Sequence, residues 1–251
     1  MSEAEYILEA TNIVKNFPGV QALKGVDLKV KKGEILGLVG ENGAGKSTLM
    51  KCIIGIHPPT SGEIIFDGTE LNKFSTIDAL NMGISMIQQE LSPIEHRPIM
   101  ENIWLGREPT TKIGLVDHQK MFQMTKELLS TIGMDDDPKM LVKDLTVAKQ
   151  QMIEIAKAIS YDAKLIIMDE PTSALSGSEI AELFSIMRKI KEEGKSIIYI
   201  SHKLDEIYEI TDRVVVLRDG TYIGAEETDK LAVNEMIKMM VGREVNELFP
   251  K

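Results

Sequence analysis

The sequence predicts an α/β fold built around a mostly parallel β-sheet. Residues 40–47 read GENGAGKS; they follow an apolar run at 35–39 and precede a helical pattern at 48–54. A second apolar run, at 165–168, ends in Asp169 and Glu170. A run that is apolar throughout suits the middle of a parallel sheet, because helices cover both of its faces. The first segment is the strand-loop-helix arrangement of a phosphate-binding loop.

The glycines of this loop explain why it can hold phosphate. Gly40, Gly43 and Gly45 can adopt conformations closed to other residues, so successive amide N–H groups can line a concave anion site at the helix N-terminus. Lys46 then reaches the β- and γ-phosphates, and the Ser47 hydroxyl binds Mg²⁺. A glycine-rich connecting turn is the structural alternative, and the Lys-Ser pair disfavours it. The residues expected to bind a nucleoside triphosphate here are Gly40, Glu41, Asn42, Gly43, Ala44, Gly45, Lys46, Ser47 and Thr48.

Composition predicts a globular protein without a nucleic-acid function. Among 251 residues, 43% are hydrophobic and 27% are charged, which suits one large α/β unit with an inserted lobe. A net charge of -10 repels phosphate backbones, so nucleic acid is not an expected partner. We find no signal peptide at the N-terminus and no apolar stretch of about 18 residues, and therefore expect a cytosolic chain. The single cysteine, Cys52, is expected to be a buried structural residue.

The first part of the chain predicts short strands and one helix. Strands are expected at 6–14 and 25–30 around a turn at 17–20, followed by strands at 62–68 and 84–87 that flank a helix at 76–82. Residues 92–161 then predict an α-helical insertion with helices at 118–132 and 148–160. In the second of these, Met152, Ile155, Ala156 and Ile159 lie on one helical face.

The remaining elements complete the predicted nucleotide-binding core. After the strand at 165–168, Ser176 and Glu179 form a capping box for a helix, and a strand follows at 196–200. A hairpin at 214–217 and 222–224 precedes a closing helix at 231–240. We therefore expect one domain: a core with an N-terminal antiparallel β subdomain at 1–91 and 162–230, a helical subdomain at 92–161, and a C-terminal helix and linker at 231–251.

Asp169 and Glu170 are the candidate hydrolytic residues. They follow the buried strand, and ligands bind at this end of the strands in α/β sheets. Asp169 is expected to hold Mg²⁺, and Glu170 to polarise the water that attacks the γ-phosphate. A solvated acidic loop is the structural alternative, which the preceding apolar strand disfavours.

The chain resembles the ATP-binding cassette of the ABC transporter family over nearly its whole length. The resemblance rests on the loop at 40–47, on LIIMDEPTSAL at 165–175 and on SH at 201–202. More narrowly, it is similar to the first cassette of bacterial monosaccharide importers, with the galactose and methyl-galactoside branch closest. The segments that carry the narrower similarity are FPGVQAL at 17–23, QEL at 89–91, WLGR at 104–107, QMIEIAKA at 151–158 and YISHK at 199–203.

The resemblance implies further site residues. Gln89 corresponds to the glutamine that contacts Mg²⁺ and the attacking water, and His202 to the histidine that contacts the γ-phosphate. Phe17 corresponds to the aromatic residue that stacks on adenine. Without the resemblance, a lone His or Phe is more often a core or loop residue. Trp104 is expected to pack inside the helical lobe.

Two segments depart from the family pattern. The signature LSGGQ is replaced by LTVAK at 145–149, so Thr146 keeps a hydroxyl while Val147 and Ala148 add Cβ atoms where close approach is needed. Ser176 replaces an expected aspartate. We therefore expect two unequal composite sites: a competent one at Lys46, Asp169 and Glu170, and a weaker one that Thr146 completes for ATP on the partner cassette.

The resemblance also implies partners and a location. They are transmembrane permease subunits, a second cassette in the same natural chain, and indirectly an extracytoplasmic sugar-binding protein, with this chain peripheral on the cytoplasmic face of the membrane. The alternative is a soluble ABC-type ATPase acting on DNA or ribosomes; the short spacing between Lys46 and Asp169 and the acidic balance disfavour it. A third alternative is a switch that binds nucleotide without hydrolysing it. Such a switch is expected to lack Glu170 or His202, and this chain has both. The expectation that the transported solute is a monosaccharide rests on the resemblance alone.

Overall fold

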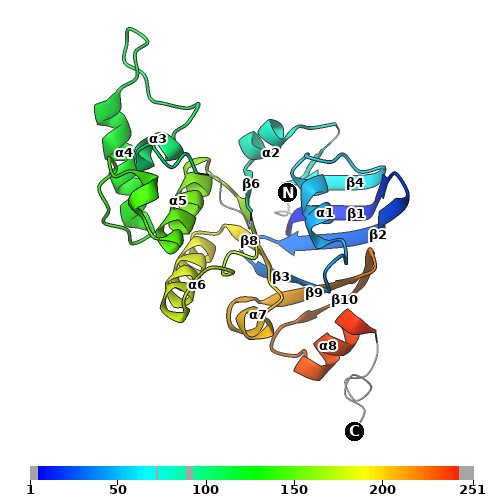
Figure 1. Ribbon diagram of the computed structural model, residues 1–251. Coiled ribbons are helices and arrows are strands. Elements are labelled where there is room, and N and C mark those ends of the chain that lie inside the picture. Colours follow the sequence, from blue (N-terminus) through cyan, green and yellow to red (C-terminus); the bar gives the residue numbers. More distant parts are fainter. Residues whose placement is uncertain (1–4, 72, 89–92, 243–251) are drawn as a thin grey trace.

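Two β-sheets organise the computed structural model, which describes residues 5–71, 73–88 and 93–242 (Figure 1). The smaller sheet is antiparallel and has the order β2-β1-β4-β5. It has a register irregularity near Asn12, whose φ is +50°. Its strands are β1 (Tyr6–Phe17), β2 (Val20–Lys31), β4 (Ser61–Phe66) and β5 (Thr69–Glu70).

The larger sheet positions the candidate site. Its order is β10-β9-β3-β8-β7-β6, and all neighbours pair in parallel except the β9–β10 hairpin. The apolar run at 165–168 therefore lies between two parallel neighbours, as predicted. The strands are β3 (Ile35–Val39), β6 (Ile84–Ile87), β7 (Leu165–Asp169), β8 (Ser196–Ile200), β9 (Arg213–Arg218) and β10 (Thr221–Glu227).

The two faces of the larger sheet belong to separate apolar clusters. Leu36 and Leu38 of β3 pack with the smaller sheet and with Leu49 of α1 (Lys46–Ile53). Ile35 and Val39 of the same strand belong to the cluster on the opposite face, as period-two alternation requires. The helices α6 (Gly177–Glu192), α7 (Leu204–Ile210) and α8 (Val233–Val241) contribute to this second cluster. Burial on both faces explains why these strands are apolar throughout.

A helical lobe lies to one side of the sheets (Figure 1). It contains α4 (His118–Thr131) and α5 (Val147–Ser160), which confirm the two predicted helices to within one residue. It also contains α3 (Ile99–Ile103) and the 3-10 turn at Val142–Asp144, which were not predicted because five residues are too few for a periodic pattern. The Trp104 indole donates to Thr125 Oγ1 at 2.9 Å, which anchors α3 against α4.

Other elements differ from the sequence expectation mainly at their ends. The helix predicted at 76–82 is α2 (Thr76–Met82), and the closing helix predicted at 231–240 is α8. Strand β2 begins five residues before position 25, because a turn at Pro18 and Gly19 leads directly into pairing between Phe17 and Val20. Helix α7 was not predicted. Within the described ranges, no helix is both long and apolar enough to cross a bilayer.

Candidate nucleotide-binding and hydrolytic site

The loop after β3 is closed by contacts that require glycine. A Cβ at Gly40 would lie 2.2 Å from the carbonyl oxygen of Leu217 at the end of β9. Gly45 has φ +101°, and a Cβ there would lie 3.1 Å from the carbonyl oxygen of Ala22. Both values are tight for a side chain, and the φ of Gly45 disfavours any other residue. The glycine spacing thus lets the loop sit directly against β2 and β9.

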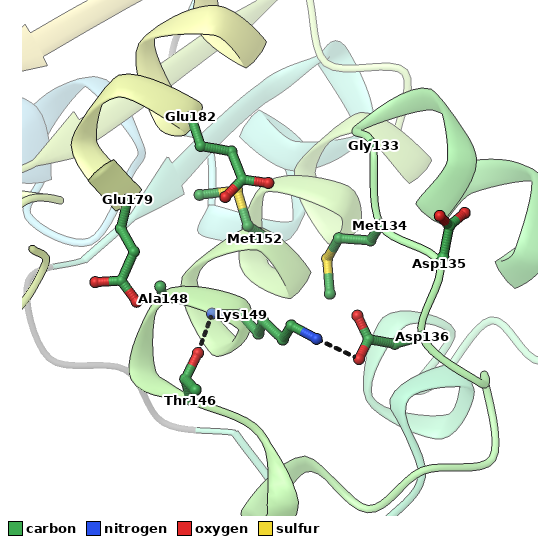
Figure 2. A pocket seen from close by; sticks show the side chains of 10 residues that line it. All are labelled: Gly133, Met134, Asp135, Asp136, Thr146, Ala148, Lys149, Met152, Glu179 and Glu182. Atoms are coloured by element: carbon green, nitrogen blue, oxygen red, sulfur yellow. Dashed lines mark hydrogen bonds and ion pairs between the residues drawn. The ribbon is translucent and has the colours of Figure 1, made fainter. Parts of the chain in front are cut away.

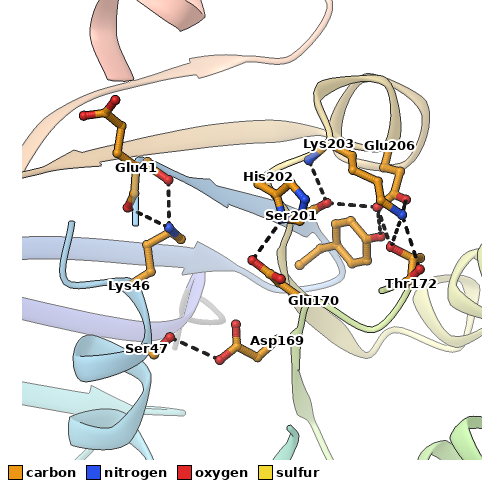
Figure 3. A network of polar contacts seen from close by, with 12 residues as sticks. Glu41, Lys46, Ser47, Asp169, Glu170, Thr172, Ser201, His202, Lys203 and Glu206 are labelled. Atoms are coloured by element: carbon orange, nitrogen blue, oxygen red, sulfur yellow. Dashed lines mark hydrogen bonds and ion pairs between the residues drawn. The ribbon is translucent and has the colours of Figure 1, made fainter. Parts of the chain in front are cut away.

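The Lys46 amine lies inside this loop. Lys46 is 8% exposed, and its Nζ donates to the carbonyl oxygens of Gly40 at 2.7 Å and Glu41 at 3.1 Å (Figure 3). Burial lowers the pKa of Lys46, and the nearby carboxylates of Glu170 and Asp169 oppose that shift. The amine is therefore held inside the loop by two backbone carbonyl groups.

Ser47 and Asp169 bring together the predicted metal ligands. Ser47 Oγ, in the first turn of α1, donates to Asp169 Oδ2 at 3.3 Å across the edge of the sheet (Figure 3). Burial raises the pKa of Asp169, as does the charge of Glu170, whereas the Ser47 hydrogen bond lowers it. A hydroxyl and a carboxylate oxygen side by side are the hard donors that Mg²⁺ prefers, so these residues fit the ion.

Glu170 and His202 converge from neighbouring strands. His202 Nδ1 lies 3.1 Å from Glu170 Oε1 (Figure 3). The Glu170 amide donates to the carbonyl oxygen of Ile200 at 2.9 Å. The Glu170 side chain is 19% exposed and that of His202 is 60% exposed. Glu170 has φ +49°, a left-handed conformation that is unfavourable for a residue with a Cβ. Strain of this kind is concentrated at functional sites.

A cavity of about 310 Å³ connects the loop with the two carboxylates. Asp169, Glu170 and the predicted phosphate-loop residues at 42–48 line it, whereas Gly40, Glu41 and His202 are not among its lining residues. Ala22 of β2 also lines it, and the sequence gives no signal for Ala22 because the contact depends on tertiary packing of the smaller sheet. The lining residues are Ala22, Asn42, Gly43, Ala44, Gly45, Lys46, Ser47, Thr48, Asp169 and Glu170.

The predicted adenine-stacking residue lies outside this cavity. Phe17, at the end of β1, is half-buried and packs edge-on against His57 with ring centroids 5.4 Å apart. The Lys15 ammonium lies 5.2 Å from the centre of the same ring. Phe17 is therefore engaged with protein groups and does not line the cavity. Gln89 lies outside the described residues.

Thr146 lines a different cavity, of about 500 Å³, between the helical lobe and α6 (Figure 2). Its hydroxyl accepts from the Lys149 amide at 3.3 Å and caps α5. The Lys149 ammonium lies 2.7 Å from Asp136 in the same cavity, and none of its lining residues is shared with the cavity at Lys46. Glu179 and Glu182 close the α6 side, so the surroundings of Thr146 are predominantly acidic.

Ser176 has a local structural role. Its amide and hydroxyl both contact Glu179 Oε2, at 2.8 and 2.7 Å, which completes the predicted capping box at the start of α6. The residue that departs from the family pattern therefore still caps this helix.

Comparisons with known proteins agree with the geometry. Residues 23–173 match the family model described as "ABC transporter". The chain is 53% identical over its whole length to a galactose/methyl galactoside import ATP-binding protein of Clostridium tetani. It is 55% identical over its whole length to a ribose/galactose/methyl galactoside import ATP-binding protein, named as putative, of Geobacillus kaustophilus. It spans about half the length of these curated relatives, covering 50% of each.

Solved structures show the same fold. The chain superposes on the ADP conformation of an ABC transporter ATP-binding cassette with a TM-score of 0.83 at 23% identity, covering 96% of this chain and 100% of that one. A nucleotide-free cassette gives a TM-score of 0.81 at 22% identity, covering 98% and 100%. At these identities the likeness establishes the fold.

Proposed function

Because this chain belongs to the ABC transporter family, as one of its ATP-binding cassette ATPases, we propose that it hydrolyses ATP to drive import of a monosaccharide. The observation that carries the proposal is the meeting of Lys46 and Ser47 with Asp169, Glu170 and His202 at the carboxyl edge of one parallel sheet. Three separate segments of the chain supply these groups: the phosphate loop and start of α1, the end of β7, and the end of β8.

In this proposal the loop binds the triphosphate before any bond breaks. Its amide groups and the helix N-terminus of α1 attract the phosphate oxygens, and the Lys46 amine exchanges its two carbonyl partners for them. Ser47 and Asp169 would hold Mg²⁺, which supplies positive charge against the phosphates when it is bound. Gln89 is proposed to join them as a ligand.

Glu170 acts as the general base on the attacking water. Its carboxylate accepts the water proton as the oxygen approaches the γ-phosphorus and the bond to the β-phosphate oxygen breaks. His202, 3.1 Å away, holds that carboxylate in place and offers a ring nitrogen toward the γ-phosphate. Phe17 is proposed to stack on adenine; without nucleotide its ring packs edge-on against His57.

Two cassettes are needed to complete each site. Thr146 is proposed to act on ATP held by the partner cassette, since it lies in a cavity separate from its own Lys46. Val147 and Ala148 prevent the close backbone approach that glycine allows at the neighbouring positions. The composite site at Lys46 and Glu170 is therefore the competent one, and the site that Thr146 completes is the weaker one.

The names of the relatives support import of galactose-type sugars. The proposed partners are transmembrane permease subunits and a second cassette, because this chain covers 50% of those relatives. A sugar-binding protein outside the membrane would act indirectly through the permease, with this chain on the cytoplasmic face.

The test is the ATPase rate of the assembled transporter carrying Glu170→Gln. Loss of the base lowers kcat by about 10²- to 10⁴-fold, while the affinity for ATP stays within about twofold. Glu63→Gln, an exposed carboxylate of β4, is the matched control and retains the wild-type rate. Substantial remaining turnover in the Glu170 variant rejects the proposal.

A further inference from the structure

A buried carboxylate outside the site joins the two loops that carry Glu170 and His202. The Glu206 side chain, in α7, is 7% exposed, and its Oε2 accepts three hydrogen bonds (Figure 3). The donors are Thr172 Oγ1 at 2.8 Å, Tyr199 OH at 2.7 Å and Ser201 Oγ at 2.9 Å. Lys203 Nζ lies 3.0 Å from the other carboxylate oxygen. Few side chains in the described residues gather so many partners.

The positions of these partners connect the carboxylate to the chemistry. Thr172 stands two residues after Glu170, and Ser201 immediately precedes His202. Lys203 also donates to the carbonyl oxygen of Thr172 at 3.2 Å. One side chain therefore ties the segment after β7 to the segment after β8, close to where Glu170 and His202 approach each other.

The ionisation of the group suits this role. Burial raises the pKa of Glu206, but the hydrogen bonds from Tyr199, Lys203, Thr172 and Ser201 outweigh burial and leave the pKa below its ordinary value. Burial and the same carboxylate raise the pKa of Tyr199, which therefore remains a donor. An ionised carboxylate surrounded by donors is a rigid junction, because charge-assisted hydrogen bonds are stronger than neutral ones.

We propose that Glu206 is a positioning residue for ATP hydrolysis, which fixes the placement of Glu170 relative to His202 by holding Thr172 and Ser201. The inference rests on the function proposed above. Glu170 has φ +49°, and a strained residue of this kind persists only where its surroundings determine it. The Thr172 contact lies on the same short loop and supplies part of that constraint. Misplacement of a catalytic group by about 1 Å costs roughly 100-fold in rate.

Glu34 provides a matched control for a carboxylate with a purely structural role. It is also buried, with a side chain 8% exposed, and it lies 2.8 Å from the Arg213 guanidinium. It directly precedes β3, whereas the phosphate loop follows β3, so it lies at the opposite end of the sheet. Glu34→Gln and Glu206→Gln thus remove the same charge from equally buried positions, one remote from the site and one beside it.

The experiment compares these variants in the full-length protein assembled with its membrane subunits. Glu206→Gln is expected to lower kcat at least about tenfold while the KM for ATP stays within about twofold, because the phosphate loop does not contact it. Both variants are expected to have a lower melting temperature than wild type, but Glu34→Gln is expected to keep kcat within about twofold. Equal kcat for the two variants, or a Glu206 effect confined to KM, overturns the proposal.

Two further variants keep the test decisive if Glu206→Gln does not fold. Thr172→Val and Ser201→Ala each remove one donor from the carboxylate, and each is expected to lower kcat severalfold with unchanged KM. Wild-type kcat in both overturns the proposal. Glu170→Gln is measured beside them. If Glu170→Gln retains turnover, the proposed function itself fails. If Glu170→Gln loses turnover while the Glu206, Thr172 and Ser201 variants keep the wild-type kcat, only the positioning role is rejected.

Discussion

Replacing single glycines by alanine separates backbone strain from steric overlap in the phosphate loop. Gly43 has φ +84°, and an added Cβ would meet no atom within 4 Å. The variant Gly43→Ala thus bears only the left-handed strain of about 1–2 kcal/mol, partly offset by about 0.4–1 kcal/mol from a less flexible unfolded chain. The net loss is about 1 kcal/mol, or about 2 °C in melting temperature for a protein of this size.

Gly40→Ala carries a second cost. The new Cβ would lie 2.2 Å from the Leu217 carbonyl oxygen, so either the loop or the end of β9 must move. Overpacking of this kind adds about 1–3 kcal/mol, which brings the expected loss to about 2–4 kcal/mol, or about 4–8 °C. The displaced loop also loses the carbonyl geometry that holds Lys46, so ATP binding weakens.

Differential scanning calorimetry of the two variants measures these losses, and titration calorimetry measures ATP binding. Gly194→Ala is the matched control, since Gly194 has φ +83°, has no atom within 4 Å of an added Cβ, and lies away from the site. We expect Gly43→Ala and Gly194→Ala to have the same melting temperature. If Gly40→Ala is no less stable than these two, the steric argument for the loop is wrong.

Three other perturbations test the site and the lobe. The pKa of Glu206 in the folded protein lies below its ordinary value of 4.5, so the stability that its charge contributes is present above pH 4.5 and disappears as the pH falls through the lower folded value. The free energies of unfolding of wild type and Glu206→Gln, measured with denaturant, should therefore converge in acid. A difference that stays constant with pH contradicts this. Lys46→Ala should raise the calorimetric Kd for ATP about 10- to 100-fold, since a hydrogen bond to a charged group contributes about 1.5–3 kcal/mol, and an unchanged Kd would show that the amine does not reach the nucleotide. Thr125→Val should cost about 0.5–1.5 kcal/mol in thermal unfolding, because the half-buried Trp104 indole loses its acceptor. The control is the same change at exposed Thr131, whose hydroxyl donates to the carbonyl oxygen four residues earlier in α4, as the Thr125 hydroxyl also does. Thr131→Val should cost less, and equal losses would argue against the indole contact.

The site was predictable where its chemistry is local in sequence. The glycine spacing at 40–47 and the apolar strand before Asp169 can each be explained by local geometry, and the two segments meet in the fold. The sequence pattern also located the capping box at Ser176, since that motif needs four consecutive residues only.

The rest depends on contacts between distant segments. Glu206 occupies an ordinary position in a short helix, and its role appears only when Thr172, 34 residues away, is seen against it. Ala22 enters the cavity because the smaller sheet packs over the loop. The helix α3 was missed because it begins directly after Pro98 and ends within five residues, too briefly for periodicity to register.

The left-handed backbone at Glu170 has a consequence for how such a cassette can be silenced during evolution. Glycine adopts this conformation without strain, and asparagine adopts it more readily than most residues, whereas a β-branched replacement would strain the turn beyond what glutamate already does. Natural replacements of Glu170 that abolish ATP hydrolysis should therefore be glycine or asparagine more often than valine. Glycine and asparagine fit the turn and leave a folded subunit that still assembles, whereas valine strains it.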